Sequence, residues 1–149
     1  MLAPVTKSIR YAWAGLLLVL LTGCSGFQRE WKRTVASGDD PLAGRWEGGW
    51  LSEVNGHHGG LRCIVTKTNA MEYQARFRAT YQIFLHFTYT VPLRADRDGG
   101  SLTFGGEADL GIAGGLYRYA GRADGSNFTA IYTSPSDHGT FRMSRPTTD

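Results

Sequence analysis

The stretch "MEYQARFRAT", residues 71–80, decides the fold class because its side chains alternate in polarity at every step. The apolar set is Tyr73, Ala75, Phe77 and Ala79, and the polar set is Glu72, Gln74, Arg76 and Arg78. Successive side chains of a β-strand point to opposite faces of the sheet. The segment therefore predicts a strand with the apolar set turned inward.

Similar runs rich in Thr, Tyr, Phe, Val and Ile recur at short intervals from Gly44 onward. They predict eight strands, over residues 44–54, 60–68, 71–81, 84–94, 101–110, 115–123, 127–133 and 139–145. The segments between them are short, and several contain Asn-Gly, Asp-Gly or Gly-Gly, which supply the positive φ that tight turns need. Short connections make each strand antiparallel to the next.

An all-β fold follows, because no helical pattern separates the runs and a parallel βαβ sheet is thereby excluded. Eight antiparallel strands in sequence close into an up-and-down (meander) β-barrel, which removes both exposed edges. The predicted barrel domain covers residues 44–145, followed by a tail over residues 146–149.

The inward positions predict how the barrel interior is filled. Bulky candidates are Trp46, Trp50, Val65, Tyr73, Phe77, Leu85, Phe87, Leu102, Phe104, Tyr117, Tyr119, Phe128, Tyr132, Phe141 and Met143. An eight-stranded barrel either fills its lumen with side chains or holds one small ligand. Both alternatives stay open: a packed core, or a pocket near one mouth where Tyr117, Tyr119 and Tyr132 could offer hydroxyls.

Residues 1–23 are predicted to be an export signal, with basic Lys7 and Arg10 before the apolar run over residues 11–21. As a helix this run rises about 16 Å, too little for a hydrocarbon core of roughly 30 Å. The sequence "LTGC", ending at Cys24, resembles the lipobox of bacterial lipoproteins. That resemblance implies cleavage before Cys24 and its acylation, with palmitate among the acyl chains. Ser25 matches the pattern sent to the outer membrane, here facing the periplasm.

The mature chain would carry 14 Lys and Arg against 13 Asp and Glu, because Lys7 and Arg10 leave with the signal. A nearly balanced charge with dispersed arginines gives no support for a nucleic-acid partner. Cys63 would be the remaining thiol. Its alternation with Arg62 and Ile64 predicts an inert core residue, the alternative being an exposed thiol that pairs with a partner. Residues 24–43 predict a flexible tether with a short helical turn over residues 30–35.

"GRWEGGW", residues 44–50, places Trp46, Gly48 and Trp50 on one face, with Gly48 leaving room between the indoles. Its Gly-x-Trp resembles the first-strand signature of the lipocalin and wider calycin families. In those families a basic residue of the last strand packs over the tryptophan and closes one barrel end. Arg145 in "GTFRMSR" takes that position. The resemblance implies that Trp46 and Arg145 close the barrel. With Trp46 as a structural plug, Trp50 remains the better candidate for a ligand contact.

No catalytic or metal motif is recognised in the sequence. His57 and His58 fall in a glycine-rich turn, His138 in another turn, and His86 on an outward strand position. We therefore predict no enzymatic activity, no cofactor and no metal. The predicted function is a membrane-anchored envelope lipoprotein that acts as an interaction module, contacting another envelope protein through its barrel surface or loops. The alternative is a lipocalin-like carrier or sensor of a small apolar ligand.

Overall fold

The computed structural model describes residues 26–35, 39–111 and 114–147. The predicted signal segment and Cys24 lie outside these residues. The chain divides into two compact units, Met1–Arg33 and Thr34–Asp149. No helix within the described ranges has the length and apolar character needed to cross a bilayer.

In the first unit, residues 26–33 form a helix. The rings of Phe27 and Trp31 stack on it with centroids 6.0 Å apart, because a spacing of four residues puts two side chains on the same helix face. The sequence predicted a tether here with a short helical turn over residues 30–35. The regular helix begins earlier than that turn.

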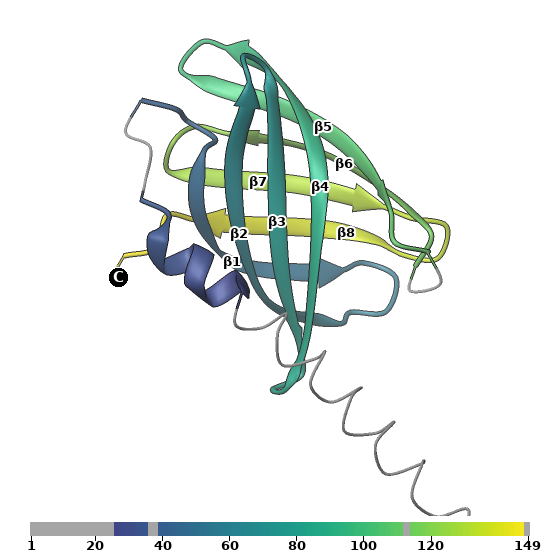
Figure 1. The fold of residues 1–149 in the computed structure, drawn as a ribbon. Helices are drawn as coiled ribbons and strands as arrows, with labels where there is room; N and C mark the ends of the chain where they lie inside the picture. Colours follow the sequence, from purple (N-terminus) through teal and green to yellow (C-terminus); the bar gives the residue numbers. More distant parts are fainter. Residues whose placement is uncertain (1–25, 36–38, 112–113, 148–149) are drawn as a thin grey trace, which may run out of the picture. The chain divides into compact units, whose positions relative to one another are not determined.

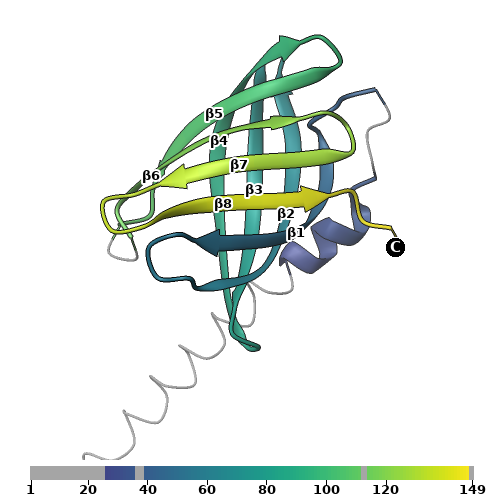
Figure 2. The ribbon, with the colours of Figure 1, turned by 180° about the vertical axis from the view of Figure 1, so that it is seen from behind.

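The second unit is an eight-stranded antiparallel barrel in which each strand pairs with the next and β1 pairs with β8 (Figures 1 and 2). The strands are β1 (Gly44–Ser52), β2 (His58–Asn69), β3 (Glu72–Tyr81), β4 (Leu85–Asp98), β5 (Ser101–Asp109), β6 (Leu116–Ala123), β7 (Asn127–Thr133) and β8 (His138–Ser144). The predicted up-and-down barrel is confirmed. The largest difference in bounds is that β4 continues to Asp98 instead of ending at residue 94.

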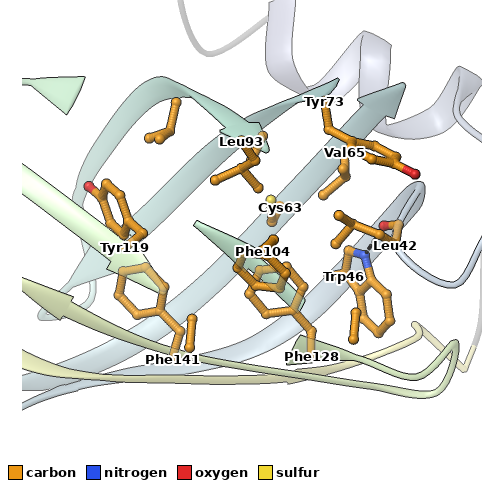
Figure 3. Packing of buried hydrophobic residues seen from close by; sticks show 14 of the residues in the cluster. Leu42, Trp46, Cys63, Val65, Tyr73, Leu93, Phe104, Tyr119, Phe128 and Phe141 are labelled. Atoms are coloured by element: carbon orange, nitrogen blue, oxygen red, sulfur yellow. Dashed lines mark hydrogen bonds between the residues drawn. The ribbon is translucent and has the colours of Figure 1, made fainter. Parts of the chain in front are cut away.

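One half of the lumen is filled by inward-pointing side chains, as the alternation predicted. Figure 3 shows Leu42 beside Trp46 at one end of this core and Tyr119 near Phe141 at the other. Cys63 is completely buried, and burial raises the pKa of its thiol well above the ordinary value. The prediction of a core thiol is confirmed.

Trp46 and Arg145 close this end of the barrel. The indole is fully buried and its Nε1–H donates to the Leu42 carbonyl at 2.8 Å. The Arg145 guanidinium carbon lies 3.7 Å from the centroid of the Trp46 ring, well inside the cation–π range. Its N–H groups also donate to the carbonyls of Ala43 at 2.8 Å and Gly125 at 3.0 Å. The predicted stacking of Arg145 on Trp46 is confirmed.

Residues just before β1 are part of the barrel, although the sequence placed them in the tether. Leu42 is completely buried and belongs to the core. Asp40 holds this segment, because its Oδ1 accepts the backbone N–H groups of Leu42 at 2.9 Å and Ala43 at 3.0 Å. Its Oδ2 accepts from Lys67 at 3.1 Å and Tyr73 at 3.0 Å.

Gly48 has a different role from the predicted one. A Cβ at this position would meet the backbone of Arg142 and Met143, so the glycine allows β8 to approach β1 closely. Gly139 does the same from β8, since a Cβ there would meet the Leu51 carbonyl. Both glycines therefore lie at the seam where the first and last strands close the barrel.

Candidate functional site

The other half of the lumen encloses a cavity of about 660 Å³. It lies at the end of the barrel where the β1–β2, β3–β4, β5–β6 and β7–β8 turns are found. Its wall is formed by Trp50, Ser52, Asn55, His57, Ala79, Tyr81, His86, Phe87, Thr88, Tyr89, Leu110, Tyr117, Tyr132, Asp137 and Phe141. A volume of this size is within the range of small-molecule sites. The structure thus combines both sequence alternatives: half of the barrel is packed and half is hollow.

The cavity exists because β4 and β5 separate toward this end. Their pairing runs from Asp98–Ser101 to Arg94–Gly105. Beyond it β4 pairs with β3 alone among the described strands, as far as Leu85 opposite Tyr81, while β5 continues with β6. Pro92 lies where the two strands part, and proline is tolerated on a strand edge because it lacks the N–H group.

This separation explains the two errors in the predicted core. Leu85 and Phe87 have the inward parity of β4, yet 41% of Leu85 and 54% of Phe87 are exposed. At these two positions β4 is no longer paired with β5, so the side chains are not covered by that strand. Phe87 instead lines the cavity, and so do Thr88 and His86. The sequence had placed His86 outward.

Trp50 lies in the wall of the hollow half. Its Nε1–H donates to the Thr80 carbonyl at 3.1 Å. This hydrogen bond joins the indole on β1 to the backbone of β3 and fixes its orientation. The Tyr81 ring lies 6.2 Å from it between centroids. Trp50 packs against the buried core and also lines the cavity. Trp50, predicted as the better candidate for a ligand contact, therefore lies in the cavity wall, and Trp46 does not.

Tyr117 and Tyr132 also line the cavity, with rings stacked at 5.9 Å between centroids. Tyr119 does not: it lies one layer deeper, with its ring 6.0 Å from that of Phe141. Its buried hydroxyl lies beside that of Tyr89 but makes no hydrogen bond of good geometry with any described residue. Burial raises the pKa of both Tyr89 and Tyr119, so neither hydroxyl ionises at neutral pH.

Asp137 is the carboxylate of the cavity wall, and the sequence did not predict it as a site residue. Its Oδ1 accepts from the Ser52 hydroxyl at 2.6 Å and its Oδ2 from the Tyr132 hydroxyl at 3.0 Å. Burial, together with the hydrogen bond to Asp137, raises the pKa of Tyr132. The sequence "SPSDH" indicated a turn, and it is one: the Asp137 N–H donates to Ser134 Oγ at 3.0 Å. Nothing in that pattern says that the carboxylate faces the lumen.

The histidines do not form a metal centre in the described part of the chain, where no group of three or more His, Cys, Asp or Glu side chains is found. His57 lies at the cavity rim, 5.2 Å from the Tyr81 ring between centroids. His86 Nδ1 lies 3.1 Å from the Thr80 hydroxyl. His138 Nε2 is 3.9 Å from the exposed carboxylate of Glu53.

The β3–β4 hairpin extends past the neighbouring strands (Figures 1 and 2). Tyr81 and His86, on either side of its turn, line the cavity. The turn contains Gln82 with a positive φ of 52°. The next two residues, Ile83 and Phe84, are 92% and 72% exposed. These exposed apolar side chains form a group, because Leu85 and Phe87 on the adjoining strand are exposed as well. Phe87 connects the group to the cavity wall.

Fold and site together define an up-and-down barrel with one plugged end and one hollow end. No protein-family model, no curated protein and no solved structure matches this chain.

Proposed function

We propose that this protein is a non-enzymatic binding protein that holds one small, largely apolar ligand in the hollow half of its barrel. The cavity itself is the observation that supports the proposal, since its volume of about 660 Å³ suits one small molecule. Aromatic rings from Trp50, Phe87, Tyr117 and Phe141 contribute much of the wall. Removing apolar ligand surface from water gives roughly 25 cal/mol per Å² of favourable free energy.

The plugged end limits how far a ligand can enter the barrel. Trp46 and Phe128, with ring centroids 5.5 Å apart, fill the lumen at that end. The Phe77, Tyr119 and Phe141 rings separate them from the cavity. A ligand therefore enters at the turns of the hollow end and stops at these aromatic rings.

The test uses residues 24–149 carrying Cys24→Ser, a chain that keeps every described residue and the whole core. The probe is N-phenyl-1-naphthylamine, a neutral fluorophore whose emission rises in apolar surroundings. We expect saturable binding of one probe per chain. Ala79→Phe should abolish it by filling the cavity, because Ala79 lies in the wall.

Gln74→Phe is the matched control, since Gln74 is exposed on the outer face of the same strand. Equal probe binding by Ala79→Phe and Gln74→Phe would contradict the proposal. Solvent extraction of the protein purified from its native membranes, followed by mass spectrometry, should recover one recurring ligand class.

The proposed location is the bacterial envelope, with the chain anchored through acylated Cys24 to the outer membrane and facing the periplasm. The support is the "LTGC" sequence after a basic and apolar leader. Several acyl chains exceed the two signals that stable anchoring takes. Cys24→Ala should release the protein from the membrane fraction or leave it unprocessed, and unchanged membrane retention would overturn the assignment.

A second candidate function is the interaction module predicted from the sequence. Residues 85–91 of β4 have no strand partner on the β5 side among the described residues, and an open edge can add a strand from a partner. The exposed Ile83 and Phe84 lie at the end of that edge.

A photo-crosslinking amino acid placed at Ile83 would test this second function in envelope extract. Gly100, in the turn at the opposite barrel end, is the matched control position. One recurring protein adduct at position 83 and none at position 100 supports the module. Lipid adducts alone, or no adduct, contradict it.

A further inference from the structure

The cavity wall contains one acidic side chain and no Lys or Arg among the described residues that line it. The acidic side chain is that of Asp137. His57 and His86 are the other titratable side chains of the wall besides the tyrosines. An anionic ligand group would therefore meet a carboxylate and no permanent cation.

Asp137 is held in place by neutral partners. The Ser52 and Tyr132 hydroxyls each donate to one of its oxygens, and the Ser134 hydroxyl donates to its backbone carbonyl at 3.0 Å. Ser52 and Tyr132 are themselves buried, so the carboxylate cannot swing out without breaking both hydrogen bonds. Each carboxylate oxygen has two acceptor positions, which leaves one on each oxygen for a ligand.

The wall around this carboxylate is apolar. Tyr132 stacks on Phe141 at 5.1 Å and on Tyr117 at 5.9 Å between centroids. A ligand whose polar group reaches Asp137 would lay its apolar part along these rings and Trp50. Because Asp137 comes from the β7–β8 turn, the polar group of such a ligand would lie near the mouth.

We infer that the cavity is specific for amphiphiles with a cationic, hydrogen-bond-donating head, of the alkylammonium class, and discriminates against alkyl carboxylates through Asp137. This inference rests on the proposed function. Hydrogen bonds between a charged donor and a carboxylate are about twice as strong as neutral ones. An alkyl alcohol can also donate to Asp137 and falls between the two classes.

Displacement of N-phenyl-1-naphthylamine by decylamine, decanol and decanoate tests the inference, because the three share one tail. The titrations are run at about pH 8, where decylamine is protonated and decanoate is ionised. We expect decylamine to displace the probe at a concentration at least about tenfold lower than decanoate, which corresponds to about 1.4 kcal/mol. Asp137→Asn should bring the two to within about threefold of each other.

Glu53→Gln is the matched control, since Glu53 is an exposed carboxylate beside the same mouth but outside the cavity wall. It should leave the amine preference unchanged. Equal displacement by amine and carboxylate, or a preference that survives Asp137→Asn, would overturn the inference while probe binding still supports the proposed function. Failure of the wild-type chain to bind the probe would instead overturn the proposed function.

Discussion

Trp46 and Trp50 lie four residues apart on β1, yet they serve opposite ends of the same lumen. Trp46 is fully buried under Arg145, whereas Trp50 is half-buried and lines the cavity. Four residues of strand span about 13 Å, which is enough to pass from the plugged half to the hollow half. The two indoles are therefore a plug and a wall, in that order along the strand.

Trp46→Ala should lower the free energy of unfolding by about 3–5 kcal/mol, as other large-to-small core substitutions do. Trp50→Ala should cost roughly 1–3 kcal/mol, because the side chain is only partly buried. Urea unfolding followed by circular dichroism measures both. Only Trp50→Ala should also weaken binding of the neutral probe. A Trp46→Ala cost no larger than that of Trp50→Ala would contradict the assignment of Trp46 as the plug.

Arg145→Ala should cost about 1–3 kcal/mol, less than Trp46→Ala, because it removes a cation–π contact and hydrogen bonds to carbonyls but leaves the indole in place. Arg145→Lys should recover only part of the loss, since an ammonium cannot reach the carbonyls of Ala43, Arg45 and Gly125 together. Arg142→Ala is the control, at an exposed position of β8. Full rescue by lysine would show that charge alone matters.

Gly139→Ala should destabilise the barrel by about 1–3 kcal/mol, because the new Cβ would meet the Leu51 carbonyl across the β1–β8 seam. It would also press on the Tyr132 hydroxyl, 2.8 Å away. Gly100→Ala is the matched control: no atom lies within 4 Å of a Cβ there. Thermal unfolding of the pair measures the difference. Similar melting temperatures would show that the seam can widen without cost.

Most of the fold could be predicted from the sequence, because alternation and turn residues act locally. Residues such as Tyr73 and Phe77 are buried as their parity requires. The sequence left a packed core and a pocket near one mouth as open alternatives, because the outcome depends on where β4 leaves β5, and Phe87 has the same parity as buried Val91. Asp137 was missed for a related reason: its turn was recognised, but the direction of its side chain depends on contacts with Ser52, 85 residues away in sequence.

Asp40 provides a test by pH, because its pKa in the folded barrel lies below the ordinary value of 3.8. Burial alone would raise this pKa, but hydrogen bonds from the Ala43 and Leu42 amides, and then from Lys67 and Tyr73, outweigh burial. A lowered folded-state pKa means that the ionised carboxylate stabilises the native state. That stabilisation is complete above the unfolded-state pKa and is lost as the pH falls through the lower folded-state value.

Asp40→Asn should therefore lower the free energy of unfolding by roughly 1–2 kcal/mol at pH 7, comparable to the loss of a helix cap. The difference from the wild-type chain should begin to shrink once the pH falls below about 4, where the carboxyl takes up a proton in the unfolded chain. It should be smallest below the lower folded-state pKa, where the carboxyl is neutral in both states. Urea titrations at a series of pH values between neutral and strongly acidic measure it. Asp96→Asn, at an exposed position of β4, is the control and should change stability by less than about 0.5 kcal/mol throughout. A cost of Asp40→Asn that is the same at neutral and strongly acidic pH would show that Asp40 acts through shape and hydrogen bonding alone, without its charge.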